Sequence, residues 1–393
     1  MDEMLTPDTV LPADGLAGTL VGRAWLKDGP SVVALRGDGV FDLSDVASTM
    51  ADLLEAADPV AMAASGNRKI GDLEPMLANS AHDRRVPGAP YFLAPIDLQA
   101  IKASGVTFAR SMLERVIEEQ ARGDASKADA FRRTITEVIG TDLSKIVPGG
   151  EAAMRLKHHL IDQGAWSQYL EVGIGPDAEI FTKAPPMAAV GTGALIGIRR
   201  DSSWNNPEPE LVVAVNSRGE IKGAMLGNDV NLRDFEGRSA LLLGKSKDNN
   251  ASTSLGPFIR LLDDTLSLDQ LRQTTISLRV RGEQDGFELN GTSSMGEISR
   301  DISDLVAQTI GANHQYPDGF VLFAGTMFAP IEDRDKPGEG FTHKTGDVVT
   351  ITCPELGMLA NRVAYCDEVP PWAFGTGALM RNLSARGLLD AKG

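Results

Sequence analysis

Three acidic side chains in the middle of the chain have the spacing of a metal site. Glu208 and Glu210 lie two residues apart in Pro207-Glu208-Pro209-Glu210, directly before the apolar run 211–215. On an extended strand, side chains two apart point to the same face, so the two carboxylates repel each other unless a cation lies between them. Asp229 offers a third carboxylate from a second apolar segment. Oxygen ligands favour a hard divalent cation, and we expect Mg²⁺, with Mn²⁺ or Ca²⁺ as alternatives.

A simpler interpretation of the same pair is a solvated face. Glu-x-Glu on the exposed side of an edge strand needs no metal, because water screens both charges. The neighbouring segments of the sequence therefore decide between the two interpretations.

Composition describes an ordinary globular protein with a strong negative charge. The chain has 393 residues, of which 42% are hydrophobic and 23% charged, and it has a net charge of −16. This length allows a large core and more than one domain. The negative charge argues against nucleic-acid partners and against anionic membranes. An acidic substrate would therefore need a local cation, which a carboxylate-bound metal supplies.

Cysteine usage and the chain start predict a cytoplasmic location. Cys353 and Cys366 are the only cysteines, and their spacing fits neither a zinc motif nor a disulfide framework. Met1-Asp2-Glu3-Met4 lacks the basic start and apolar core of a signal peptide. No apolar run approaches the length needed to cross a bilayer, so we expect no membrane partner.

The elements that must position the acids divide the chain into two parts. Residues 1–85 predict a small N-terminal α/β domain, with strands near 19–25 and 31–35 and a helical segment near 43–57. A Pro- and Gly-rich linker at 84–90 leads into a larger unit at 91–393. Its first part predicts helices at 110–119, 131–139 and 151–160. After residue 165 short β-rich runs dominate, which indicates a mainly-β core. These runs and one further helix lie at 194–198, 211–215, 276–280, 321–323 and 348–352, with the helix at 299–309.

The chain resembles the fumarylacetoacetate hydrolase superfamily over residues 100–365. Several segments carry this resemblance by their order and spacing: Phe181-Thr182-Lys183-Ala184-Pro185, Asn206 to Glu210, Gly227-Asn228-Asp229-Val230, Lys247, Leu255-Gly256-Pro257, Asn290 to Met295 and Gly325-Thr326. Ala100 to Ala109 and Lys247-Asp248-Asn249-Asn250 are most similar to the sugar-acid branch of dehydratases. The chain departs from the hydrolase branch at Gly325-Thr326-Met327, where Gly-Thr-Pro is usual.

The resemblance implies a fold and an activity. The fold would be α/β with a mixed-sheet, barrel-like catalytic domain behind the small N-terminal domain. The activity would be Mg-dependent removal of water from 2-keto-3-deoxy-D-xylonate or -arabinonate, giving 2,5-dioxopentanoate in pentose catabolism. The partners would be this small oxo acid and further copies of the chain, in a homodimer or homotetramer. The spacing of Lys247 also resembles the dehydratase branch, so Lys247 is preferred over Lys245 as the residue beside the metal, where a cation would lower its pKa.

Further candidate residues come from their types and positions. Glu179 is a candidate general acid/base, with a water-facing carboxylate at a strand start as the alternative. Thr326 and Ser293 are candidate hydroxyl contacts for the substrate, or turn residues that bond their own backbone. Lys183 is a candidate substrate-binding cation, or a partner of a nearby acid.

Two other classes of function remain open. Another metal-dependent enzyme on the same scaffold would be a C–C hydrolase of acylpyruvase type, an oxo-acid decarboxylase or an isomerase, whereas a binding or scaffolding protein would be catalytically silent. The five histidines lie outside the motif segments, which weakens the hydrolase alternative because hydrolytic members use a His-Glu pair. Three mutually repelling acids argue against a silent protein.

Overall fold

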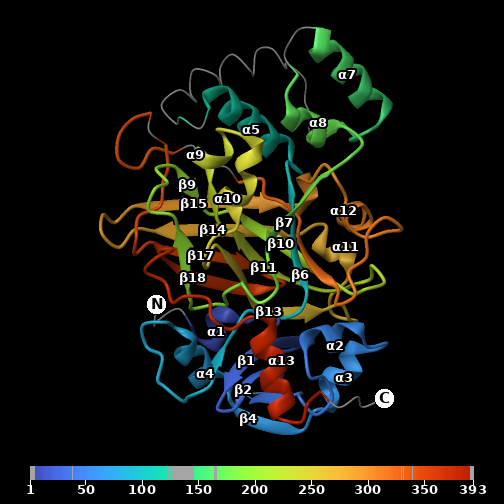
Figure 1. Cartoon of the computed structure of the whole chain (residues 1–393), viewed down its shortest axis with the longest axis vertical. Coiled ribbons are helices and arrows are strands. Elements are labelled where there is room, and N and C mark those ends of the chain that lie inside the picture. Colours follow the sequence, from blue (N-terminus) through green and yellow to red (C-terminus); the bar gives the residue numbers. More distant parts are fainter. Residues whose placement is uncertain are drawn as a thin grey trace.

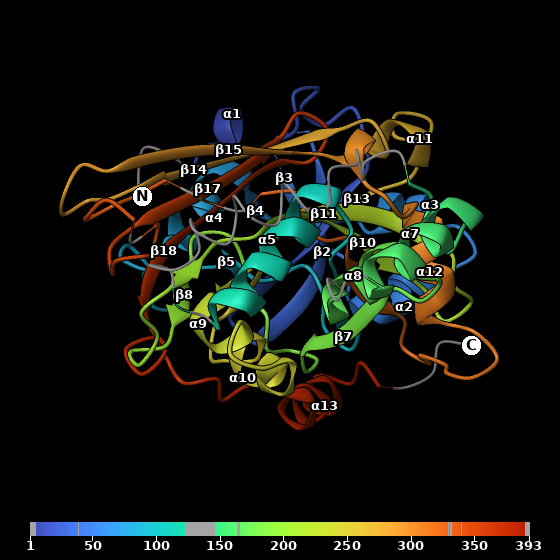
Figure 2. The same ribbon diagram turned by 90° about the horizontal axis from the view of Figure 1, so that it is seen from above.

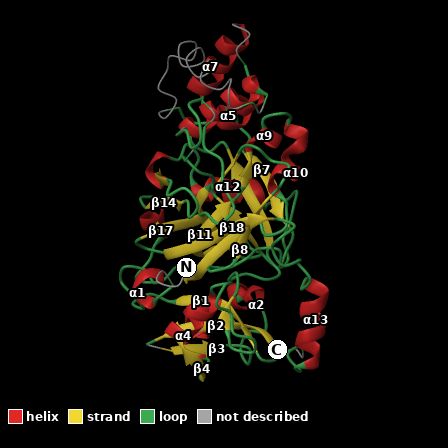
Figure 3. Ribbon diagram, turned by 90° about the vertical axis from the view of Figure 1, so that its left-hand side faces the viewer, coloured by secondary structure: helices red, strands yellow, loops and turns green. Residues whose placement is uncertain are grey.

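The computed structural model describes residues 5–37, 39–122, 124, 146–162, 166–328, 330, 332–338 and 340–389. The molecule is elongated, with the N-terminal strands at one end and a group of helices at the other (Figures 1 and 3). The expected helix at 131–139 lies outside the described residues. Among those that are described, no helix is both long and apolar enough to cross a membrane.

One large sheet runs through most of the molecule. Its strands follow the order β4-β3-β2-β1-β13-β11-β10-β16-β6-β7, and β5 pairs with β1. The strands are β1 (Leu20–Leu26), β2 (Gly29–Arg36), β3 (Gly39–Asp42), β4 (Arg68–Asp72), β5 (Tyr91–Phe92), β6 (Ala100–Gly105), β7 (Glu179–Ala184), β10 (Pro209–Val215), β11 (Ile221–Asp229), β13 (Thr253–Leu261) and β16 (Phe320–Phe323). Every residue of β10 is buried, as expected for a central strand with both faces covered.

A second, five-stranded sheet packs on the first. Its order is β15-β14-β17-β18-β8, and contacts of β10 with β14 and of β11 with β17 join the two layers. The strands are β8 (Leu195–Ile198), β14 (Thr275–Arg281), β15 (Glu288–Ser294), β17 (Val348–Cys353) and β18 (Gly357–Tyr365). In β14 alternate residues are buried, and Ile276, Leu278 and Val280 face the shared core. A separate short pair, β9 (Asn205–Asn206) with β12 (Asn231–Leu232), lies beside the start of β10.

Helices lie around the sheets and at both ends. They are α1 (Pro7–Val10), α2 (Met50–Glu55), α3 (Pro59–Ser65), α4 (Leu73–Ser80), α5 (Ala109–Ala121), α7 (Glu151–Asp162), α8 (Gln168–Ile174), α9 (Arg233–Glu236), α10 (Leu243–Lys247), α11 (Leu268–Leu271), α12 (Ile302–Thr309) and α13 (Thr376–Ala385). Side chains of α5, α7 and α8 form a small apolar cluster of their own. Figure 2, seen from that end, shows this group above the sheets.

The predicted elements are largely confirmed, with shifts at their ends. The helix expected at 299–309 begins at Ile302, because the Asp301 side chain accepts the N–H of Ser303 and caps it there. The mixed, sheet-dominated fold is also confirmed. The described strands of the large sheet form an open path from β4 to β7, however, and not a closed barrel.

The N-terminal strands belong to the same sheet as the expected catalytic unit. β1 pairs antiparallel with β13, with Leu20 opposite Arg260. Helix α13 returns to this end, where Asn382 donates to the carbonyl of Asp28 and Arg386 to that of Pro30. The division into a domain at 1–85 and another at 91–393 stays a prediction.

Candidate metal centre and active site

Two paired strands bring the three acids together. Glu208 directly precedes β10, Glu210 lies within it, and Asp229 ends β11. The antiparallel register places Glu210 opposite Gly227, and the N–H of Asp229 donates to the carbonyl of Glu208 over 3.0 Å. Each acid offers an oxygen, and these oxygens lie within 4.8 Å of one another. All three side chains are buried, so the solvated-face interpretation does not apply.

The charges around these acids fit a divalent cation. Burial, and then the carboxylates of Asp229 and Glu208, raise the pKa of Glu210 well above its usual range. Among the described residues the cavity has five carboxylates, whereas three cations contact them. The carboxylates belong to Glu179, Glu208, Glu210, Asp229 and Glu236, and the cations to Arg115, Lys183 and Lys247. With all of these groups charged, the excess of two negative charges is what one hard divalent ion would cancel.

Lys247 lies directly against two of the three acids. It ends α10, and its Nζ is 2.6 Å from Glu208 Oε2 and 3.1 Å from Asp229 Oδ2. The ammonium also lies 5.7 Å from the ring centre of Phe181. Burial lowers the pKa of Lys247, but the Asp229 and Glu208 carboxylates outweigh burial and raise it. A cation bound to the same carboxylates would oppose this rise. That a bound cation lowers the pKa of Lys247 therefore stays a prediction.

Lys183 lies behind the acids and not in the cavity. Its side chain is 0% exposed, and its Nζ is 2.9 Å from Asp229 Oδ1. It also donates to the carbonyls of Val230 and Lys247. Lys183 therefore ties the end of β11 to the end of α10, and it is absent from the described cavity lining.

Glu179 lines the same cavity as the three acids. It begins β7, pairs with Gly105 of β6 and lines the cavity together with Phe181, two residues on. A Cβ at position 105 would lie 1.9 Å from Glu179 Oε2, so a larger residue there would displace this carboxylate. Burial, and then the Glu236 carboxylate, raise the pKa of Glu179 to about 7. A carboxyl with this pKa is suited to exchange protons near neutral pH.

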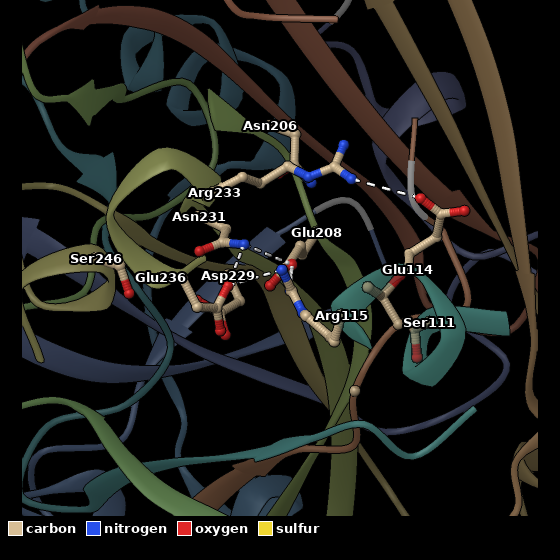
Figure 4. A network of polar contacts seen from close by, with 12 residues as sticks. Ser111, Glu114, Arg115, Asn206, Glu208, Asp229, Asn231, Arg233, Glu236 and Ser246 are labelled. Carbon is tan, nitrogen blue, oxygen red and sulfur yellow. Dashed lines mark hydrogen bonds and ion pairs between the residues drawn. The ribbon is translucent and has the colours of Figure 1, made fainter. Parts of the chain in front are cut away.

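Helix α5 contributes a cation that the sequence did not reveal. Arg115 forms ion pairs with Glu208 and, over 2.7 Å, with Glu236 Oε2 on α9. Asn231 donates to the same two acids, over 3.2 Å to Glu208 and 2.7 Å to Glu236 (Figure 4). The expected helix at 110–119 contained Arg115, but nothing in its spacing pointed to residues about a hundred positions later.

The two hydroxyl candidates differ in position. Thr326 lines the cavity, and its Oγ1 accepts the N–H of Phe328. Ser293 is fully buried, accepts the N–H of Met327 over 3.0 Å and is absent from the described lining. Its role there is to hold the loop that carries Thr326.

Histidines take no part in the described cavity. None of the five contributes to its lining within the described ranges. His343, for example, is buried against Asp347, with Nδ1 and Oδ2 3.1 Å apart. The chemistry available in this cavity is that of carboxylates, a lysine, an arginine and three hydroxyls, those of Ser104, Ser111 and Thr326.

Comparison with known proteins places this geometry in a family. The pattern of the fumarylacetoacetate (FAA) hydrolase C-terminal family matches residues 156–364. A 2-dehydro-3-deoxy-D-arabinonate dehydratase of Saccharolobus solfataricus is 35% identical over 188 residues, which cover 47% of this chain and 58% of the relative. A probable 2-keto-3-deoxyxylonate dehydratase of Haloferax volcanii is 32% identical over 196 residues, covering 50% and 63%. The matched segments thus span about three fifths of these relatives.

Solved structures agree with the fold. An apo 2-keto-3-deoxy-D-arabinonate dehydratase superposes with a TM-score of 0.61 at 22% identity, covering 88% of this chain and 99% of that one. The same enzyme complexed with magnesium and 2,5-dioxopentanoate gives a TM-score of 0.60 at 22% identity, with the same coverage. At this identity the likeness concerns the fold. Since the family pattern covers more than half of the chain, the protein belongs to the fumarylacetoacetate hydrolase family.

Proposed function

We propose that this protein is a Mg-dependent dehydratase that converts 2-keto-3-deoxy-D-xylonate or -arabinonate to 2,5-dioxopentanoate. The observation that carries the proposal is the cavity in which three buried acids, Lys247 and Glu179 meet. Two relatives above 30% identity bear dehydratase names for these sugar acids, and one solved structure of the same fold contains magnesium and 2,5-dioxopentanoate.

Glu208, Glu210 and Asp229 would hold the ion. When bound there, a divalent cation polarises the 2-oxo group and stabilises the negative charge that develops when a C3 proton leaves. Lys183 keeps Asp229 in place from behind, because its Nζ holds Oδ1 and the following main chain.

Elimination needs a base for C3 and an acid for C4. Lys247 is our candidate base, since its Nζ lies against the acids that would anchor the substrate, and an ion bound to those acids would oppose the rise of its pKa. Glu179 is our candidate acid, because its raised pKa of about 7 keeps a proton available near neutrality. The proton from Glu179 would leave with the C4 hydroxyl as water. The unsaturated oxo acid then tautomerises through its C5 enol to the aldehyde.

Thr326 would contact the hydroxylated end of the substrate from the cavity wall. For Ser293 and Lys183 we propose supporting roles behind the cavity instead of contact with the substrate, because neither lines it.

One incubation tests the activity. The protein is mixed with 2-keto-3-deoxy-D-xylonate and Mg²⁺, and an aldehyde dehydrogenase reports the formation of 2,5-dioxopentanoate. Pyruvate from C–C cleavage, or carbon dioxide, would identify a hydrolase or a decarboxylase and contradict the proposal. If no 2-keto-3-deoxypentonate epimer is consumed, the proposed activity is rejected and only the assignment of the metal site is kept.

We further propose that the chain forms a homodimer or homotetramer in the cytoplasm. The free thiols of Cys353 and Cys366 support a reducing compartment. Sedimentation equilibrium tests the assembly, and a single species at the mass of one chain would contradict it.

A further inference from the structure

Arg115 is the most accessible of the three cations that contact the cavity acids. Its side chain is 13% exposed, compared with 3% for Lys247 and 0% for Lys183. Arg115 lines the cavity and also a smaller hollow beside it, where Ser111 and Thr326 are its neighbours. Lys183 is enclosed by backbone carbonyls and Asp229, and Lys247 by the Glu208 and Asp229 carboxylates. Of the three cations, the Arg115 side chain is therefore the one with the most exposed surface for a ligand.

The two ends of this guanidinium have different surroundings. Nη1 is 2.7 Å from Glu236 Oε2, and Asn231 holds that same oxygen over 2.7 Å. Nη2 contacts Glu208, which also contacts Lys247. One end is therefore anchored on α9, whereas the other end shares its partner with a second cation and with the metal that Glu208 would bind. An ion on Glu208 would weaken the hold on Nη2 and leave Nη1 in place.

Charge balance explains why an acid needs such a group. A divalent ion only neutralises the cavity when all five carboxylates and three cations are charged, and the same holds when Glu179 is protonated and Lys247 neutral, as their proposed roles require. A 2-oxo acid brings one more negative charge into a buried site, and burying a charge without a partner is strongly unfavourable. The planar fork of arginine matches both oxygens of a carboxylate.

We propose that Arg115 receives the carboxylate of the 2-oxo acid substrate, with Glu236 and Asn231 positioning its guanidinium. This role rests on the proposed function, because it takes an oxo acid as the ligand. It makes α5 part of the binding site, and it gives Glu236 a purpose that the metal and the proton transfers do not explain.

The alternative is that Arg115 merely pins α5 to α9. Loss of Arg115 should change the affinities for the divalent cation and for the oxo acid in opposite directions if it binds the substrate, and in the same direction if it only holds α5 against α9. Removing a positive charge beside Glu208 should strengthen the binding of a divalent cation, whereas removing an acid receptor should weaken the binding of an oxo acid. Loss of a structural pin would weaken both.

The experiment uses the full chain and three titrations by calorimetry. Mg²⁺ is titrated first, and then pyruvate and its neutral analogue pyruvamide are titrated into the Mg²⁺-saturated protein. For Arg115→Met we expect tighter Mg²⁺ binding and pyruvate binding weakened by about 10- to 100-fold, the usual effect of losing a charge-assisted pair. Pyruvamide binding should change little, so the ratio of pyruvate affinity to pyruvamide affinity should be smaller in Arg115→Met than in the wild type.

Two further variants secure the result. Arg115→Lys keeps the charge without the fork, and we expect near-normal Mg²⁺ affinity with an intermediate loss of pyruvate affinity. It also serves if the methionine variant folds poorly. Arg122 is exposed and directly follows α5, so Arg122→Met removes the same charge outside the cavity and should change none of the three affinities.

Weakening of Mg²⁺ and pyruvate together, or unchanged pyruvate binding in both Arg115 variants, would overturn the inference. The protein could also fail to dehydrate pentonates while Arg115→Met still tightens Mg²⁺ binding and weakens pyruvate binding. That result would support the role of Arg115 and reject only the proposed substrate.

Discussion

The floor of the cavity and its wall are built from different kinds of structure. The floor consists of Glu208, Glu210 and Asp229 on β10 and β11, which have hydrogen-bonded neighbours on both sides in the large sheet. The wall consists of Glu179 on β7, the strand at the end of the sheet order, and Arg115 on α5. Floor residues are 3% exposed or less, whereas Arg115 is 13% exposed and Glu179 only partly buried.

This difference separates what must be fixed from what must adapt. Metal ligands have to keep their spacing, and central strands hold it because a slip of one residue would turn every side chain over. Groups that meet the substrate have to exchange partners and protons, and an edge strand and a helix at the end of the molecule allow that more readily. We therefore expect changes in the floor to abolish the reaction and changes in the wall to tune it.

The largest effect should follow loss of one floor carboxylate. Glu208→Gln, Glu210→Gln and Asp229→Asn keep side-chain volume but remove a charge that holds a hard cation. We expect turnover to fall by at least about 1,000-fold, the scale of a lost metal ion's contribution. Steady-state kinetics and Mg²⁺ calorimetry measure the two losses together, and EDTA should reproduce them in the wild type.

Glu220→Gln is the matched control for the floor. Glu220 lies at the opposite end of the same β10–β11 pair, and its side chain is 50% exposed. Activity should stay normal in this variant. Full turnover in a metal-stripped wild-type sample would contradict the metal assignment itself.

The next largest effect should come from Lys247, which joins floor and wall. Lys247→Ala should lower kcat by about two to four orders of magnitude, the usual contribution of a positioned acid or base. Exchange of the C3 hydrogen with solvent deuterium should be lost too, which NMR of the recovered substrate detects. Pyruvate binding should fall much less, because the metal provides most of the anchoring.

Lys245→Ala is the control for that result. Both lysines lie on the short helix α10, but two residues turn a helix by more than half a revolution. The Nζ of Lys245 lies 5.0 Å from the ring centre of Phe235, away from the acids. Near-normal turnover in Lys247→Ala together with an inactive Lys245→Ala would show that the assignment is two residues out of register.

The contrast between the floor and the wall of the cavity also determines which site residues could be predicted from the sequence. Glu208 and Glu210 followed from the two-residue period of a strand, and the resemblance to a family supplied Lys247. Arg115 and Glu236 could not be found, because their contact depends on how α5 packs against α9 and not on local spacing. Lys183 and Ser293 were predicted to contact the substrate, but the structure places both behind the cavity lining, because a residue type does not reveal whether a side chain faces a cavity or the backbone behind it. Local periodicity thus predicted the floor, whereas the wall required the tertiary structure.

Glu179 should give a smaller effect that depends on pH. Its acid form donates the proton, so kcat should fall as pH rises through its pKa, at or below about 7 because a bound cation lowers it. Glu179→Gln should slow dehydration while C3 exchange persists, which separates the C4 acid from the C3 base. Loss of exchange in this variant would instead make Glu179 part of the C3 step.

Stability offers a second measure of the same group. A carboxyl with a raised folded-state pKa contributes its full stability below the ordinary value near 4.5, and this contribution declines as pH rises to about 7. Glu179→Gln avoids that decline. Without added metal, the variant should therefore gain in Tm over the wild type at pH 8 relative to pH 4.5, as calorimetry can measure. An equal difference at both pH values would contradict the raised pKa.

The smallest effects should distinguish the two hydroxyls. Thr326→Val removes a hydroxyl from the cavity lining, and we expect KM for the pentonate to rise by less than about tenfold, the scale of one neutral hydrogen bond. Ser293→Ala leaves the buried N–H of Met327 without its acceptor, which should destabilise folding by about 1–3 kcal/mol while KM stays closer to normal. Thermal unfolding and steady-state kinetics on both variants give the comparison. A large KM effect of Ser293→Ala with unchanged Tm would mean that Ser293 reaches the substrate, and the loop at 325–328 would then have to move away from it during binding.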